Sequence, residues 1–271
     1  MSFSIDHVVI ASNDLDGAIV NARAAGFKVV PGGVHGAGNT HNALIGFADG
    51  SYMELIAPTP QGRAGEHRWF DRIRNGGGLT DFCLLGADLN TEVARIHEAG
   101  IEYSKPFAMA RVTPDGTRIE WLLSTPPGPT GRNGWPFMIE DKTPRAIRVP
   151  HAPDQIRHEN GAQGVAGITV LVRDVDTSSK ACEAILGAEP QTTVDPEGRL
   201  RRLFFIKGAW IQVREPRSGE ERDHLARHGQ GPYQVSLRSS DGPVAPDDGS
   251  FLDPALFSGA KIMTVTWNSR G

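Results

Sequence analysis

The sequence predicts an α+β fold built from repeated βαβββ modules. Three stretches each begin with a short apolar strand and a helix and end in another apolar strand; they cover residues 5–58, 79–126 and 165–216. A repeat of about 70 residues is too long for the unit of a solenoid. Duplicated half-domains that pair to bury one face of a sheet are the better interpretation.

Each predicted module opens in the same way. The strands HVVIA, DFCLL and TVLVR are each followed by Asp and an apolar residue, and Asp is a preferred helix N-cap. Apolar residues then recur at helical spacing until Gly26, Gly100 and Gly187, where we expect the helices to end. Turn residues such as Pro31-Gly32-Gly33 and Pro114-Asp115-Gly116 divide the remainder into further strands.

The modules group into two regions. The first two modules, at about 5–58 and 79–140, are expected to form one domain over residues 1–148. Residues 164–271 contain a degenerate third module and a partial fourth one, which opens at GPYQVSLRSSDG and has a supporting role. A polar, proline-containing segment between Lys142 and Gly164 is the predicted linker.

Length and composition indicate a soluble globular protein of the size of an enzyme. The 271 residues are 39% hydrophobic and 22% charged, and the net charge of -4 gives no electrostatic footprint for nucleic acid. The first residues lack a basic leader, and no run of about 18 apolar residues indicates a membrane partner. We therefore expect a cytoplasmic protein with two free thiols, Cys83 and Cys182. The sequence leaves open whether the protein forms a homodimer.

Polar residues recur at matching positions of the repeats. His7 in the first opening strand matches Asp81 in the second, and Glu54 in the first closing strand matches Glu120. The third module has Gly167 and Gln212 at these positions, so we place the chemistry in the first two modules. A carboxylate on an enclosed apolar sheet face costs several kcal/mol unless it is paired, protonated or bound to a metal.

The repeat, opened by DHVVI and closed by MELIAP, resembles the vicinal oxygen chelate superfamily. That superfamily includes glyoxalase I, methylmalonyl-CoA epimerase, extradiol dioxygenases and the fosfomycin and bleomycin resistance proteins. The segment HGAGNTHN, residues 35–42, is similar to a glyoxalase-like group within it. The resemblance covers residues 5–140 well and weakens through the third module. It implies that two modules form a half-open barrel around a shared cleft.

This resemblance implies a divalent metal site with His7, Glu54, Asp81 and Glu120 as ligands. One imidazole and three carboxylates suit Mn, Fe, Ni, Mg or Zn. The superfamily usually has His or Gln where this chain has Asp81. In the alternative interpretation, Asp81 merely begins a strand, Glu120 pairs with Arg118 or another cation, and His7 is a core histidine with satisfied hydrogen bonds.

The segment HGAGNTHN supplies a predicted substrate-binding group. Its polar side chains can donate and accept hydrogen bonds at the mouth of the cleft, and the predicted contacts are His35, Thr40, His41 and Asn42. The alternative is a turn in which the amide and hydroxyl groups satisfy the backbone and the histidines face solvent.

The resemblance implies a metal-dependent lyase or isomerase that acts on a small carbonyl or vicinal-oxygen compound. The metal would polarise the carbonyl and stabilise an enediolate, while Glu120, or Glu54 in second place, would move the proton. Two alternatives remain. One is an extradiol-type Fe(II) dioxygenase, disfavoured because that site requires two histidines and His7 alone is at hand. The other is a metal-free binding protein that sequesters a ligand, as resistance proteins do.

Overall fold

The computed structural model describes residues 3–36, 38–62, 67–128, 134–195, 197–239 and 249–265. Its first module contains β1 (Ser4–Ala11), α1 (Leu15–Ala24), β2 (Val30–His35), β3 (Thr40–Gly46) and β4 (Tyr52–Pro58). After α2 (Phe70–Arg74), the second module contains β5 (Gly78–Leu85), α3 (Leu89–Glu98), β6 (Phe107–Val112), β7 (Arg118–Ser124) and β8 (Phe137–Asp141). The predicted α+β fold with βαβββ modules is confirmed.

The two modules form a closed barrel, which corrects the half-open barrel that we expected. Within the described residues the strand order is β1-β4-β3-β2-β6-β7-β8-β5. The modules meet at β1 and β5, where His7 lies opposite Cys83, and at β2 and β6, where His35 lies opposite Arg111. The second seam closes the barrel because the ends of the two hairpins come within backbone hydrogen-bonding distance.

The second module ends later than its sequence suggests. Residues 117–126 contain β7, whereas the strand equivalent to β4 is β8, since β8 is the strand that runs parallel to β5 as β4 runs parallel to β1. In this register Val9 lies beside Glu54, and Cys83 lies beside Phe137. Phe137, rather than Glu120, therefore occupies the position in the second module that Glu54 occupies in the first.

The remaining strands build a second sheet with the same module pattern. The segment between the sheets holds α4 (Arg145–Arg148) and α5 (Pro153–Ile156). The third module contains β9 (Gly164–Leu171), α6 (Val175–Leu186), β10 (Gln191–Val194), β11 (Leu200–Ile206) and β12 (Ala209–Arg214). After α7 (Gly219–His228) follow β13 (Gly231–Arg238), β14 (Ser250–Phe251), the short helix η2 (Pro254–Phe257) and β15 (Lys261–Val265). Parts of the predicted fourth module, residues 240–248 and 266–271, lie outside the described residues.

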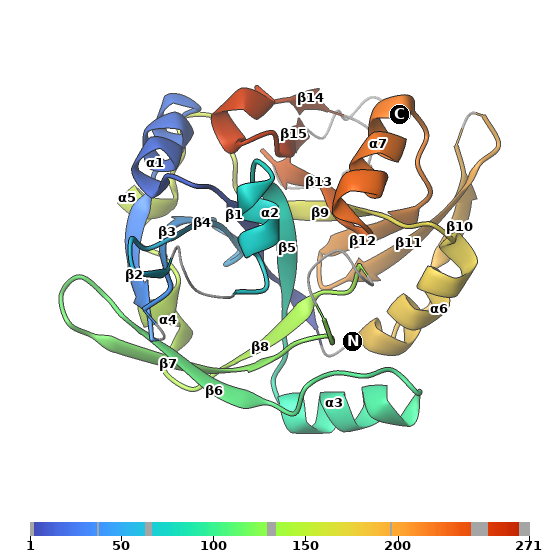
Figure 1. The fold of residues 1–271 in the computed structure, drawn as a ribbon, viewed down its shortest axis with the longest axis horizontal. Helices are drawn as coiled ribbons and strands as arrows, with labels where there is room; N and C mark the ends of the chain where they lie inside the picture. The colour runs from blue at the N-terminus through green and yellow to red at the C-terminus, as the bar shows by residue number, and fades with distance from the viewer. Residues whose placement is uncertain are drawn as a thin grey trace.

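The sheets share one large apolar core. Val8 and Ile10 on the outer side of β1 belong to the same buried cluster as Ile168 and Val170 of β9. Fully burying such a side chain stabilises the fold by about 1.5–3 kcal/mol. Figure 1 shows α3 and α6 toward one edge of the molecule, where Arg95 of α3 donates to backbone carbonyls of α6. The expected supporting role of the C-terminal region is consistent with this shared core.

Two of the three predicted Asp caps act as expected, whereas Asp14 occupies the N-cap position of α1 without accepting a capping hydrogen bond through its side chain. The side chain of Asp88 accepts hydrogen bonds from the backbone N–H groups of Asn90 and Thr91 and caps α3. Asp174 caps α6 in the same way, and Gly187 ends this helix in the left-handed conformation with φ of 62°. No helix in the described part of the chain is long and apolar enough to cross a bilayer.

Candidate active site

Neighbouring parallel strands place an imidazole beside a carboxylate inside the barrel. His7 on β1 and Glu54 on β4 both point inward, and His7 Nε2 lies 3.4 Å from Glu54 Oε2. Both side chains are buried, with exposed fractions of 3% and 5%. Successive side chains of β1 and of β4 point to opposite faces of the sheet, so every second residue points inward. The polar pair therefore lies among inward apolar residues such as Val9 and Ile56.

A buried carboxylate orients His7 from the other side. His7 Nδ1 donates to Asp6 Oδ2 at 2.7 Å, and the ring stacks on Tyr52 with centroids 4.5 Å apart. Asp6 in turn accepts two hydrogen bonds of 2.9 Å from Arg148 and one from Arg145. Burial would raise the pKa of Asp6, but the positive charge of Arg148 and the hydrogen bond from His7 hold this pKa well below its usual value.

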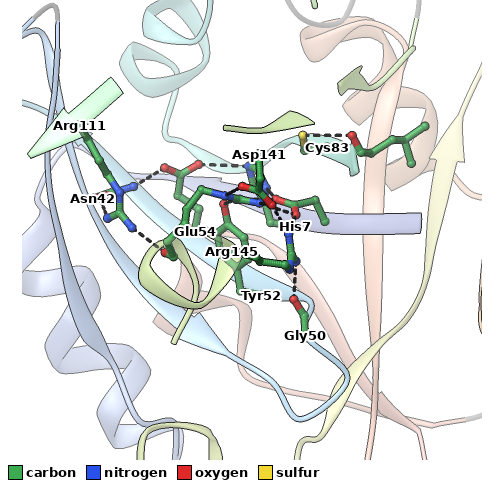
Figure 2. Close-up of polar contacts among 12 residues, drawn as sticks. His7, Asn42, Gly50, Tyr52, Glu54, Cys83, Arg111, Asp141 and Arg145 are labelled. Carbon is green, nitrogen blue, oxygen red and sulfur yellow. Dashed lines mark hydrogen bonds and ion pairs between the residues drawn. The ribbon is translucent and has the colours of Figure 1, made fainter. Parts of the chain in front are cut away.

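The segment HGAGNTHN brings a second imidazole to the same carboxylate. His35 Nε2 lies 3.6 Å from Glu54 Oε1, while His35 Nδ1 lies 2.7 Å from Thr40 Oγ1. Asn42 Nδ2 donates to Glu54 Oε1 at 2.6 Å (Figure 2). Each oxygen of Glu54 therefore faces one histidine.

The neighbours of Glu54 determine its charge. Burial alone would raise the pKa of Glu54, but the hydrogen bond and charge of His7, followed by the charge of His35, lower it to about 2. Burial lowers the pKa of His35. Burial also opposes the rise in the pKa of His7 that its hydrogen bonds to Asp6 and Glu54 cause. At neutral pH the centre thus holds an ionised carboxylate between two imidazoles that differ in proton affinity.

These residues line a cavity of about 130 Å³ with two unlike walls. The first module supplies the polar wall, which contains His7, His35, Thr40, Asn42, Tyr52 and Glu54. The second module supplies an apolar wall, which contains Met109, Trp121, Leu123, Phe137 and Ile139. A ligand here would meet polar groups on one side and aromatic or aliphatic groups on the other.

The structure does not bring Glu120 to this cavity, and this corrects its predicted role as ligand and base. Glu120 lies on the outer face of β7, with half of its side chain exposed, and accepts from Arg118 Nε at 2.8 Å. Its neighbours Ile119 and Trp121 point inward instead. The discrepancy arises because β8, and not β7, is the strand equivalent to β4, and because Glu120 belongs to the outward-facing set of alternating side chains in β7.

Asp81 points inward but is held away from His7 and Glu54. It accepts from Trp69 Nε1 at 2.9 Å and pairs with Arg68 Nη2 at 3.0 Å. Burial raises the pKa of Asp81, although Arg68 and Trp69 favour the charged form. Asp81 is engaged by Trp69 and Arg68, and Phe137, which pairs with Cys83 in the parallel register, is apolar, so the described residues of the second module contribute no free ligand atom to the centre.

His41, the fourth predicted substrate contact, does not line the cavity. It lies between Thr40 and Asn42 on β3, so its side chain points to the opposite face of the strand. Thr40 lines the cavity, and its hydroxyl contacts His35.

Another cluster of ligand-type groups does not suit a metal. Among the described residues, Asp6, His7 and Cys83 have candidate ligand atoms within 4.8 Å of one another. However, both oxygens of Asp6 already accept hydrogen bonds from Arg148. Burial raises the pKa of the Cys83 thiol well above its usual value, and its sulfur faces the Leu84 carbonyl (Figure 2). Asp6 therefore acts as the partner that orients His7.

The donor set that fits a divalent metal is His7, His35 and Glu54. Both imidazoles present Nε2 toward the same carboxylate, and both have Nδ1 held by a polar neighbour, as metal-binding histidines usually do. Two nitrogen donors and one oxygen donor suit Fe, Mn, Ni or Zn better than Mg. A bound cation would replace the direct contacts that Glu54 now makes with the two rings.

Several residues of the site were missed from sequence. Arg148 and Arg145 lie in the segment predicted to be a linker, and Arg148 is 3% exposed. His67 and Trp69 line the cavity from the segment between the modules. A signal was available for Asp6 alone: period two places it on the opposite face from His7, where a buried acid requires a cation.

A family model described as a glyoxalase-like domain matches residues 5–186. The chain belongs to this glyoxalase-like family. A search of curated proteins finds no match. The resemblance to the vicinal oxygen chelate superfamily is confirmed, and the matched residues extend the family assignment through β9 and α6 of the third module.

Solved structures share the fold of this glyoxalase-like protein at low sequence identity. A hypothetical protein from Staphylococcus aureus aligns with a TM-score of 0.72 and 13% identity, covering 98% of this chain and 100% of its own. A mutant of 4-hydroxymandelate synthase from Streptomyces coelicolor aligns with a TM-score of 0.65 and 12% identity, covering 100% and 94%. The arrangement of barrel and second sheet therefore recurs as a unit.

Proposed function

We propose that this glyoxalase-like protein is an enzyme that holds one divalent metal ion at His7, His35 and Glu54. The observation that carries the proposal is the second imidazole: His35 lies beside the Glu54 oxygen that His7 leaves free. Two histidines and one carboxylate with open positions are typical of non-heme Fe(II) oxygenases. An oxygen-dependent reaction on a small substrate with two adjacent oxygens is the function that this donor set supports best.

The protein's own groups have definite roles in this proposal. Asp6 and Thr40 hold the Nδ1 atoms, so that both Nε2 atoms face the cavity, and Asn42 holds Glu54. When bound, Fe(II) would supply Lewis acidity and the electron that reaction with O2 requires. The apolar wall would cover a flat hydrocarbon part of the substrate and exclude water.

The lyase or isomerase reaction that the sequence suggested lacks a suitable base. Glu120 lies outside the barrel, and a pKa of about 2 makes Glu54 a weak base compared with the optimum near the working pH. Burial lowers the pKa of His67 to about 4, so this ring is neutral. Its Nδ1 accepts from the backbone N–H of Trp69 at 3.4 Å, which assigns the proton to Nε2 and makes His67 a donor to a substrate oxygen.

The test compares His35→Ala with His41→Ala. The two histidines belong to the same segment, but His41 does not line the cavity. Anaerobic Fe(II) titration should show more than about 100-fold weaker binding for His35→Ala, because the loss of a direct ligand costs more than the loss of an outer partner, and no change for His41→Ala. Oxygen uptake with a panel of catechols and aromatic 2-oxo acids should depend on Fe(II) and on His35.

Other outcomes separate the alternatives. Metal binding without oxygen uptake, together with C–H exchange in D2O of a carbonyl substrate, would support the lyase or isomerase. Failure of the wild-type protein to bind any divalent metal would support a ligand-sequestering protein. Equal metal binding by His35→Ala and wild type would refute the assignment of His35.

A further inference from the structure

A second cavity, of about 170 Å³, lies where the barrel meets the C-terminal region. Residues of α2 and β5 form one side, and residues of α7 and the start of β13 form the other. The basic residues of its lining are Arg68, Arg72, Arg227, His224 and His228. The acidic residue of the lining, Asp71, points to solvent and pairs with Arg74. The basic groups are therefore gathered without matching negative charge in the lining.

Arg72 is the central cation of this cavity. Its Nη2 donates to the Leu79 carbonyl at 3.3 Å, while its Nε and Nη1 are buried and have no hydrogen-bond partner among the described residues. Buried donors of a charged group are costly when unsatisfied. Burial, followed by the charge of Arg227, lowers the pKa of Arg72 to about 10. An acceptor with negative charge would relieve both effects.

The two histidines of α7, His224 and His228, lie near the same positive charges, those of Arg72 and Arg227. His224 and His228 lie with ring centroids 4.7 Å apart. Burial, followed by the charges of Arg72, His228 and Arg227, lowers the pKa of His224 to about 3. Neutral imidazoles can still donate N–H groups to an anion without adding charge.

Three acids on the surrounding elements, Glu220, Glu221 and Asp81, have other partners. Glu221 of α7 pairs with Arg214 at 2.7 Å, and Glu220 pairs with Lys261 at 2.6 Å. Asp81 of β5 accepts from Trp69 and pairs with Arg68 on the barrel side. Each of these carboxylates has a cation of its own, so the deficit of negative charge around Arg72 persists.

We propose that this interface cavity binds a small oxyanion, as free phosphate or as the phosphate group of a larger ligand, through Arg72 and Arg227 with α7 histidines as donors. Arginine is well suited to phosphate because its planar N–H groups match the oxygens. The bound anion would join α2 to α7. Because α2 follows Trp69, which lines the candidate active site, the anion would also fix one wall of that site.

The experiment is a calorimetric titration of the full chain with inorganic phosphate in a chloride-poor buffer. Arg72→Gln should weaken phosphate binding by about 10- to 100-fold, since charge-assisted hydrogen bonds are lost. Arg227→Gln should weaken it by about three- to tenfold, because Arg227 is exposed at the rim. The control is Arg222→Gln, which removes one charge from the same helix outside the lining and should leave binding unchanged.

Phenyl phosphate distinguishes the two sources of the anion. Tighter binding of the ester than of inorganic phosphate indicates a larger ligand, and the reverse order indicates the free ion. Should Arg72→Gln fail to fold, Arg227→Gln and His224→Gln carry the test on their own. The proposal is overturned if phosphate does not bind at about 10 mM, or if the folded lining variants bind it as tightly as Arg222→Gln.

Discussion

Replacing Asp6 with asparagine removes the carboxylate that joins His7 to two arginines. Asp6 is fully buried, and Arg148, which donates to both of its oxygens, is 3% exposed. Removing one partner of a buried ion pair typically costs about 3–5 kcal/mol. Arg148 keeps its contacts with Asp141 and with the Tyr52 hydroxyl, so we expect the lower end, about 3 kcal/mol of unfolding free energy.

The Asp6→Asn variant should also bind metal less well. The amide oxygen can still accept from His7 Nδ1, but it no longer carries the charge that makes the ring a better ligand, so we expect about tenfold weaker affinity. Chemical denaturation and Fe(II) titration measure the two effects. The matched control is Asp16→Asn on the exposed side of α1, which should change stability by less than about 0.5 kcal/mol. An Asp6→Asn protein that matched this control in both assays would refute the positioning role of Asp6.

Three further predictions test other parts of the structure. Glu120→Gln should retain wild-type metal affinity and turnover, because Glu120 is ion-paired outside the barrel; loss of either would return it to the site. The folded-state pKa values of His224 and His228 are about 3 and about 4, below the unfolded value of about 6.5. The free energy of unfolding should therefore fall as the pH drops below about 6.5. Chemical denaturation at about pH 5 should show a smaller loss of this free energy in His224→Gln than in the wild type. Ending the chain after Lys142 removes Arg145 and Arg148 and uncovers the apolar face of β1, so thermal unfolding should begin at a lower temperature; an equally stable fragment would contradict this.

Local signals in the sequence were sufficient to predict the βαβββ modules. Asp88 and Asp174 cap helices because their carboxylates reach backbone N–H groups two or three residues later. His7 and Glu54 were also found, because both stand as polar residues in apolar strands of matching modules. These features depend on residues that are close in sequence or repeated at an equivalent place.

Long-range features of the site could not be predicted in this way. The sequence favours Glu120 because β7 has an apolar pattern similar to that of β4, and the chain alone does not reveal that β8 is the strand that runs parallel to β5. The equivalence of Phe137 and Glu54 is consequently not evident from the sequence. The position of Arg148 depends on the chain returning to the barrel after β8, which no local pattern encodes.

Anomalous diffraction from crystals loaded with Fe(II) or Zn(II) tests the central claim most directly. The account predicts one strong peak inside the barrel, bonded to His7 Nε2, His35 Nε2 and Glu54 at about 2.0–2.2 Å. A peak bonded to Asp81 or Cys83 instead, or a barrel without any metal peak in loaded crystals, would contradict it.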